Sequence, residues 1–366
     1  MRTPCLLLFF PLIVIVPVQS IEEPGSESSH NEKVDGPEKG RPADSVKYGG
    51  WSTAASIFPG TVLHGSGHFV AGDTDAALML LKYEGLSILT LAAGGVPFAI
   101  SGASDKTNWI TIPVLAAGLG GFLYTMSLNW YGAANGGRLA KPRTGRDPEI
   151  NLGYANYSNA ELAIEHVVNA NATFYHGQFQ FTPQVAMSPG ASYQNYFLES
   201  KWQLLGSEGF WPLEKNDTSY VNLGTSVDYQ RFSDFGASIS AAELFFDFRY
   251  QLDRLHHTFS GSYAETEFGY STIFYGFDST GNLFEDHNHS LVIRFVFGFV
   301  FEVGKSEFDW SMFYDHKRYT LVGGIPGGVA GYFGSALKFT MSTIIARLEV
   351  ASGSALATQF SLGYRF

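Results

Sequence analysis

The chain has 366 residues, of which only 16% are charged while 15% are aromatic, and its formal net charge is −11. The aromatic content excludes a disordered chain, because disorder goes with few aromatic residues and much charge. The acidic balance argues against a nucleic-acid-binding protein, which needs a basic surface. The mean hydropathy is only +0.01, so polar residues dilute the apolar ones almost one for one, unlike in a helical membrane protein.

The first twenty residues have the pattern of a secretory signal peptide. They start with one basic residue, Arg2, continue with an apolar run from Cys5 to Val18, and end on the small Ser20. The run is shorter than the roughly 20 residues of a membrane-spanning helix, so we expect a signal peptide over 1–20 that is cleaved after Ser20. Cys5 is the only cysteine, which leaves the exported chain without disulfide or thiol chemistry.

The next segment, residues 21–50, is rich in Pro, Gly, Ser and charged residues up to Val46. Such a composition cannot bury an apolar core and predicts a disordered acidic linker.

A helical hairpin is expected over residues 51–133. Two apolar stretches, Ala76–Ile100 and Trp109–Ala133, flank a polar turn at 101–108. Small residues in the sequence AAGLGG, 116–121, have the spacing that lets two helices approach closely in lipid. The sequence leaves open whether these helices lie in lipid, in the periplasm or against another part of the protein.

The segment before the first apolar stretch contains candidate metal ligands. His64 and His68 are four residues apart, and Asp73 and Glu84 follow them, a His and carboxylate set of the kind that zinc uses. A structural role is favoured over metal binding, because the glycines around the histidines favour a tight bend and Asp73 is suited to cap the next helix. The Pro-Gly, Gly-His and Gly-Asp pairs over 56–132 resemble those before paired helices in some uncharacterised bacterial envelope proteins, which implies an envelope location.

After a linker at 134–148, the hydrophobic period changes to two. In the last strand Phe360, Leu362, Tyr364 and Phe366 alternate with polar or small residues. Many of these segments run for twelve residues or more, longer than strands of globular proteins, which average five or six. Together with a Phe-rich face and a polar face, this length predicts a mainly β fold over 149–366, a transmembrane antiparallel β-barrel.

Ten strands can be assigned, and twelve is the alternative because 161–172 is ambiguous and bacterial barrels prefer even numbers. The ten predicted strands are 149–158, 173–187, 191–206, 219–233, 237–252, 257–277, 290–303, 307–322, 333–349 and 355–366.

Charged residues on the polar face of these strands are expected to point into the barrel. They either line a narrow path for solutes or pair with one another as a plug, and the plug is favoured in so small a barrel. The predicted inward residues are Glu243, Asp247, Arg249, Glu265, Glu267, Arg294, Glu302, Asp309, Asp315, Lys317 and Lys338.

The C-terminal sequence QFSLGYRF resembles that of the Gram-negative outer-membrane β-barrel class. The resemblance covers about residues 149–366 and implies an outer-membrane location, contact with membrane lipid and recognition by the barrel-assembly machinery. It also implies that Phe360, Leu362, Tyr364 and Phe366 form the assembly signal.

Signals for catalysis are weak. Asp253, His256 and His257 are one cluster, and Glu285, Asp286, His287 and His289 are expected in one loop, but neither spells out a nucleophile with a base. We therefore expect no enzyme and no cofactor. The first expectation is a structural or partner-binding barrel that acts through a periplasmic hairpin, and the alternatives are a narrow solute channel and a rim-located enzyme or metal-binding protein.

Overall fold

The computed structural model describes residues 46–101, 105–135, 146–158, 164–213, 217–256, 259–277, 282–303, 306–316, 321–322 and 331–366. The expected signal peptide, most of the two linkers, His257 and Lys317 lie outside the described residues, as does the side chain of Glu302.

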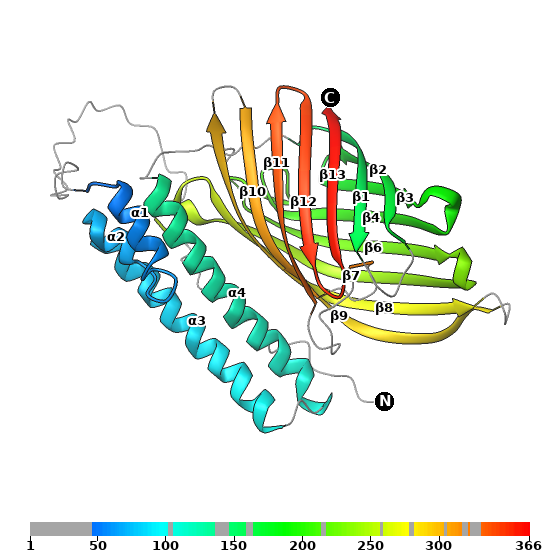
Figure 1. The fold of residues 1–366 in the computed structure, drawn as a ribbon, viewed down its shortest axis with the longest axis horizontal. Helices are drawn as coiled ribbons and strands as arrows, with labels where there is room; N and C mark the ends of the chain where they lie inside the picture. The colour runs from blue at the N-terminus through cyan, green and yellow to red at the C-terminus, as the bar shows by residue number, and fades with distance from the viewer. Residues whose placement is uncertain are drawn as a thin grey trace, which may run out of the picture. The chain divides into compact units, whose positions relative to one another are not determined.

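The C-terminal part of the chain forms a closed antiparallel barrel of twelve strands (Figure 1). The ring closes because β1 pairs with β13 and β3 pairs with β4, while the two-residue β5 (Trp211–Pro212) adds to β4 outside the ring. The barrel strands are β1 (Glu149–Ser158), β2 (His166–His176), β3 (Phe179–Met187), β4 (Tyr193–Gly206), β6 (Tyr220–Phe232), β7 (Ala237–Gln251), β8 (Ser262–Phe277), β9 (Asn282–Val303), β10 (Ser306–Asp315), β11 (Tyr332–Met341), β12 (Ile344–Ser352) and β13 (Leu356–Arg365).

The prediction of a transmembrane-type barrel is confirmed, and its alternative count of twelve strands is correct where ten was wrong. The segments predicted as single strands at 173–187 and 333–349 each contain a two-residue turn. Gly177 and Ser342 make these turns with φ angles of +57° and +54°. Because both arms of each hairpin alternate in the same way, periodicity alone does not reveal the reversal.

The barrel wall is apolar outside and polar inside. On β7, Leu244 and Phe246 are 55% and 43% exposed, whereas their neighbours Glu243 and Asp247 are 5% and 2% exposed. Successive strand residues point to opposite faces, so the exposed face is the outer wall and the buried face lines the lumen. Such a wall suits a barrel surrounded by lipid, whose closed ring leaves no unpaired strand edge.

Four helices precede the barrel: α1 (Gly50–Ile57), α2 (Ser66–Ala71), α3 (Thr74–Ile100) and α4 (Asp105–Asn135). The carboxylate of Asp73 accepts a hydrogen bond from the backbone N–H of Ala76, so the predicted helix cap is confirmed. Both α3 and the 110–134 part of α4 are long and apolar enough to cross a membrane.

Helices α3 and α4 form an antiparallel pair whose backbones come close at glycines. A Cβ built on Gly118 would lie 2.5 Å from the backbone nitrogen of Leu91, and one on Gly94 would lie 2.5 Å from that of Leu115. These glycines allow the two helices to pack closely.

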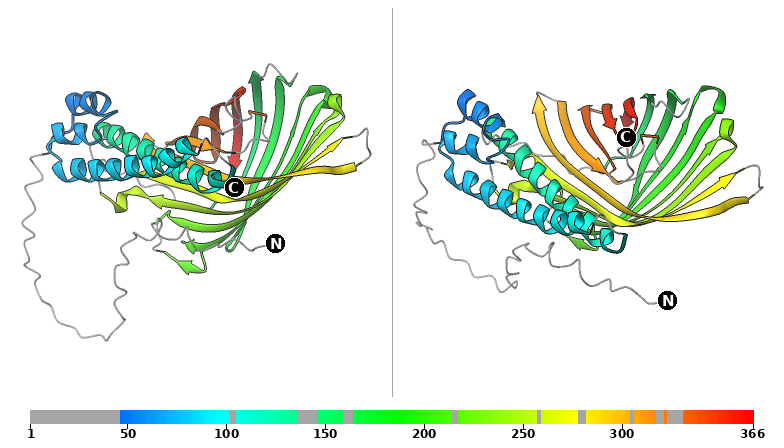
Figure 2. Two further views of the ribbon diagram at one scale, coloured as in Figure 1. Left: turned by 90° about the horizontal axis from the view of Figure 1, so that it is seen from below. Right: turned by 60° about the horizontal axis from the view of Figure 1, so that its bottom comes forward.

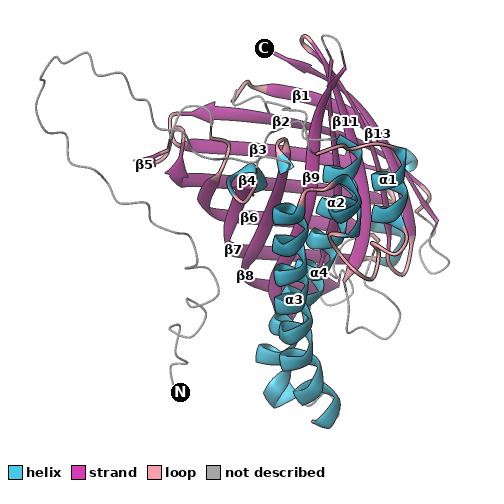
Figure 3. Cartoon of the chain, turned by 90° about the vertical axis from the view of Figure 1, so that its left-hand side faces the viewer, coloured by secondary structure: helices cyan, strands magenta, loops and turns pink. Residues whose placement is uncertain are grey.

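The helical hairpin lies outside the barrel, along the wall near β9 and β10 (Figures 2 and 3). Tyr124 and Tyr131 of α4 donate hydrogen bonds to the carbonyl oxygens of Glu265 (2.9 Å) and Ser260 (2.7 Å). An apolar cluster joins the same elements; its buried members are Leu80, Leu128, Leu252, Phe259 and Phe297. The hairpin is therefore attached to the barrel through α4.

Candidate functional site

The lumen holds a cluster of ion pairs centred on Lys201 of β4. Its Nζ lies 3.0 Å from a carboxylate oxygen of Asp247 and 3.4 Å from one of Glu267 and one of Glu199. The four residues come from β4, β7 and β8, so the contacts connect neighbouring and more distant strands across the lumen.

Two arginines extend this cluster. Arg294 of β9 lies 3.5 Å from Glu267 and 4.0 Å from Asp315, and Arg249 of β7 lies 3.0 Å from Glu265. The Arg249 guanidinium also stacks 3.6 Å above the ring of Tyr263.

Tyr263 in turn donates a 2.7 Å hydrogen bond to Asp309. We call this group the central cluster, and its charged members are Glu199, Lys201, Asp247, Arg249, Glu265, Glu267, Arg294, Asp309 and Asp315.

Among the residues that the structure describes, the central cluster sets three cations against six carboxylates, which makes this described part of the lumen acidic. A buried carboxylate is costly unless a cation or a hydrogen-bond donor compensates it. Asp247 also accepts a hydrogen bond from the side-chain amide of Asn222. The excess of carboxylates makes this part of the lumen a favourable place for a mobile cation.

A second ion-pair group lies where the first and last strands of the barrel meet. Lys338 of β11 donates hydrogen bonds of 2.9 and 3.2 Å to the two carboxylate oxygens of Glu149 on β1. Arg365 of β13 donates a 3.2 Å hydrogen bond to the same carboxylate. These contacts link three strands at the closure of the ring.

Beside the central cluster the lumen contains a polar cavity of about 340 Å³. Amides and tyrosines dominate its lining, with Arg347 and Glu349 paired at 2.6 Å in the same wall. Arg294 and Asp315 belong to both the cavity and the central cluster. The amide and tyrosine residues that line it are Tyr157, Asn171, Gln184, Tyr193, Asn195, Gln230, Tyr332 and Gln359.

The structure brings most of the predicted inward residues together. Glu243 accepts a 2.6 Å hydrogen bond from Ser226, and Lys338 belongs to the second group. The predicted residues that make ion pairs or hydrogen bonds within the central cluster are Asp247, Arg249, Glu265, Glu267, Arg294, Asp309 and Asp315.

Lys201, the lysine at the centre of the cluster, is not among the residues predicted from the sequence to point inward. Lys201 and Glu199 lie an even number of residues after the inward Tyr193 in the predicted strand 191–206, so their side chains face the same side. This alternation could have identified them as inward residues. Glu149, at the first position of β1, was overlooked because a single strand end shows too little alternation to assign a face.

The candidate metal ligands His64, His68 and Asp73 are buried but do not converge. His64 Nδ1 lies 2.7 Å from the Thr125 hydroxyl, and His68 Nδ1 lies 2.8 Å from the hydroxyl of Tyr48, which donates to Asp73. Across the described ranges, no three His, Cys, Asp or Glu residues are placed to hold a metal ion. Burial lowers the pKa of His64, and it lowers that of His68 to about 4.

The clusters considered for catalysis are separated in the structure. Asp253 belongs to the short turn after β7, whereas His287 and His289 lie in β9, opposite Phe274 and Thr272 of β8. The expectation that residues 285–289 form a loop was therefore wrong, because β9 begins at Asn282. The polar residues there interrupt the apolar alternation that defines the rest of the strand.

The side chains expected to form the assembly signal lie on the outer wall. Phe360, Leu362 and Tyr364 are 48%, 53% and 49% exposed along β13. Phe366 follows the strand and is 66% exposed. They form one apolar ridge on the last strand of the barrel.

No protein-family model matches the sequence, and no curated protein matches it. Several solved barrel structures resemble part of this chain. One described as "KdgM porin in complex with disordered oligogalacturonate" is 8% identical, with a TM-score of 0.38 over 60% of this chain and 99% of that one. The NanC porin is 10% identical, with a TM-score of 0.38 over 59% and 98% of the two chains.

The outer membrane protein Omp33 of Acinetobacter baumannii is also 10% identical, with a TM-score of 0.32 over 60% of this chain and 98% of that one. Likenesses of this size carry no argument about activity. We assign this chain as an outer-membrane β-barrel protein because its ring of strands is closed and the outer wall of the ring is apolar.

Proposed function

We propose that the protein is a narrow passage for small polar solutes and cations across the outer membrane. The observation that carries this proposal is the polar cavity of about 340 Å³ in the lumen, bordered by the acidic central cluster. The twelve-stranded ring leaves room for this cavity, whereas a smaller barrel of about eight strands is filled by its own side chains.

A passage accounts for the charged lumen better than a purely structural filling does. Buried ion pairs contribute little net stability, and apolar side chains of similar volume often replace them at no cost. A lumen that only had to be filled would therefore gain nothing from Lys201, Arg294 and their carboxylates. Where solutes and water enter, the same groups keep the path polar, and the surplus of carboxylates favours cations over anions.

Conductance in planar lipid bilayers tests this proposal. Purified full-length protein is expected to produce discrete current steps in KCl. The Lys201→Gln variant removes the cation held by Asp247, Glu267 and Glu199. Each current step should therefore become larger, and K⁺ should carry a greater share of it.

The matched control is Lys82→Gln, which removes the charge of an exposed lysine on α3, outside the lumen. Its current should equal that of the unmodified protein. Absence of current above the lipid background in all three proteins, each shown to be folded by heat-dependent migration on a gel, would reject the passage.

A second candidate role is structural and concerns the hairpin. The hydrogen bonds from Tyr124 and Tyr131 support a brace for β8 and for the segment just before it. The exposed apolar side chains of α3, among them Leu86, Leu89 and Val96, offer a surface for lipid or for a partner in the envelope. Deletion of 51–133 should lower the unfolding temperature of the barrel, and an unchanged temperature with unchanged co-purifying proteins would contradict both roles.

A further inference from the structure

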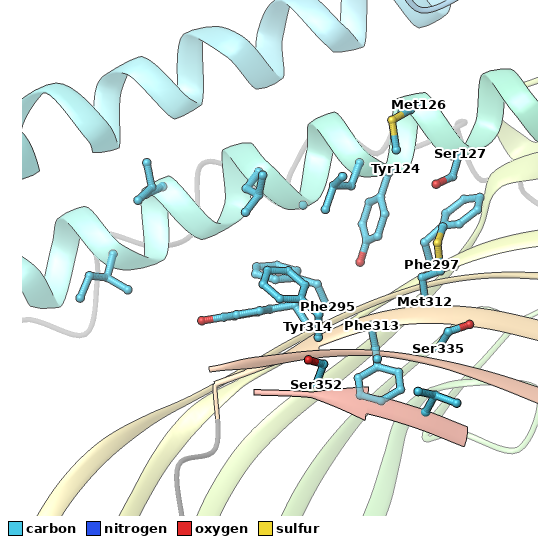
Figure 4. A pocket seen from close by; sticks show the side chains of 18 of the residues that line it. Tyr124, Met126, Ser127, Phe295, Phe297, Met312, Phe313, Tyr314, Ser335 and Ser352 are labelled. Atoms are coloured by element: carbon cyan, nitrogen blue, oxygen red, sulfur yellow. The ribbon is translucent and has the colours of Figure 1, made fainter. Parts of the chain in front are cut away.

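A second cavity lies outside the barrel, between α4 and the outer wall (Figure 4). It has a volume of about 580 Å³. Leu115, Leu119 and Leu123 line it from the helix, and Met312, Phe333 and Val350 line it from β10, β11 and β12. It is distinct from the polar cavity in the lumen, because the wall of the barrel separates the two.

We propose that this cavity binds one acyl chain of a phospholipid from the surrounding bilayer. The proposal does not depend on the passage through the lumen. It rests on the position of the cavity, on its size and on the chemistry of its lining.

The position points to a lipid because the cavity is continuous with the lipid-facing wall. Phe333 and Val350 line it and are still 37% and 40% exposed on that wall. In a membrane this surface meets hydrocarbon, so an acyl chain is the apolar group present at high concentration at the opening. A void lined by apolar side chains forfeits dispersion contacts, which an acyl chain would restore.

The length of the cavity suits one acyl chain. Along α4 the lining extends from Ile112 to Ser127, a rise of about 22 Å. One leaflet of hydrocarbon is about 15 Å thick, so the cavity is long enough to hold the part of one acyl chain that spans a leaflet.

One polar atom in the lining lacks a partner. Ser127 is 2% exposed, and its hydroxyl makes no hydrogen bond within the described part of the chain. Figure 4 shows Ser127 on the side of α4 that is turned toward the strands, near Phe297. A buried hydroxyl without a partner is unfavourable; the ester carbonyl of a phospholipid at this end of the cavity would accept a hydrogen bond from it.

Photo-crosslinking tests the proposal. The full-length protein is reconstituted into phosphatidylethanolamine vesicles that contain a phospholipid with a diazirine in its acyl chain. It is then extracted into detergent, freed of exchangeable lipid by gel filtration, irradiated and mapped by peptide mass spectrometry. We expect about one lipid per protein molecule to remain, since its acyl chain is enclosed on two sides. Crosslinks should be concentrated in 112–127 and in β10–β12.

Val350→Phe narrows the cavity and should lower the crosslinked fraction about fivefold, as expected for the loss of one or two buried methylene contacts. The matched control is Val227→Phe, the same change at an exposed outer-wall valine of β6 away from the cavity, which should leave the fraction unchanged.

Ser127→Ala keeps the fold and should also lower the crosslinked fraction. Crosslinks spread evenly around the barrel, a crosslinked dimer in place of lipid, or folded variants that all retain the lipid would overturn the proposal.

Discussion

At the scale of single residues, the buried histidine at the junction of hairpin and barrel is the most sensitive to pH. His68 has no exposed surface and packs edge-on against the ring of Phe259, with ring centroids 5.9 Å apart. Burial lowers its pKa to about 4, Asp73 partly opposes this shift, and His256 adds to it. His68 is therefore neutral in the folded protein at pH 7.

Acid should loosen this junction. An unfolded histidine titrates near 6.5, so the unfolded state takes up the proton first and the stability of the junction falls as the pH drops from about 6.5 to 4. The loss reaches up to about 3 kcal/mol below pH 4. The rate at which a protease cleaves the helical hairpin at pH 7.5, 5.5 and 4.5 measures this loss of stability. In the His68→Gln variant the cleavage rate should depend less on pH. Equal cleavage rates at all three pH values would contradict this assignment.

Gly118 is the residue on which helix packing depends most directly. Its substitution by alanine would place a Cβ 2.5 Å from the backbone nitrogen of Leu91, so α3 and α4 must separate. Gly118→Ala should therefore lower the temperature at which the helical circular-dichroism signal is lost. The control is Gly85→Ala on α3, where nothing lies within 4 Å of the new Cβ; alanine should be neutral there or stabilise the helix by up to about 1 kcal/mol. Equal melting of the two variants would count against close packing at Gly118.

Sequence spacing misled most at the paired histidines. His64 and His68 are four residues apart, which on one helix would place them on one face. Gly65 instead has a φ of +94° and precedes α2, so the two side chains reach different partners, Thr125 and Tyr48. The spacing alone indicated a shared helix face, whereas the glycines beside the histidines indicated the bend that the structure shows.

At the scale of elements, the sequence identified most strands but missed two tight reversals. The turn at Ser342 and Thr343 joins β11 to β12 without glycine or proline, the residues that usually mark such a turn. The helical hairpin of α3 and α4 was predicted from its apolar helices. Its place along the barrel wall depends on tertiary packing of Leu80 and Leu128 against Phe297. No local pattern encodes that contact, since lipid would satisfy the same apolar residues.

The same turn yields a test of the strand assignment. Ser342 holds a left-handed φ of +54°, which costs a residue other than glycine about 1 kcal/mol. Ser342→Gly should therefore raise the stability of the barrel in urea by up to about 1 kcal/mol, after allowance for the added flexibility of the unfolded chain. Thr343→Gly, at a position where φ is not positive, should lower it. A lower stability of Ser342→Gly would show that no such turn exists.

At the scale of the whole molecule, alternation, strand length and the terminal aromatic residues were enough to predict a membrane barrel. The width of the lumen could not be predicted in the same way, because it depends on the number of strands. The two missed turns changed that number from ten to twelve. The count of strands matters for function: the lumen holds the expected pairs of charged residues and, beside them, a cavity of about 340 Å³. The position of each charge followed from strand parity, whereas the pairing of Lys201 with three carboxylates depends on how the ring closes.

The reversal potential across a planar bilayer, with KCl ten times more concentrated on one side, tests the central claim most directly. The acidic central cluster predicts that K⁺ carries more of the current than Cl⁻. The double variant Asp247→Asn, Glu267→Gln, which removes two carboxylates in contact with Lys201, should move the potential toward zero. A potential that favours Cl⁻ in the unmodified protein, or one that the double variant leaves unchanged, would contradict a passage lined by this cluster.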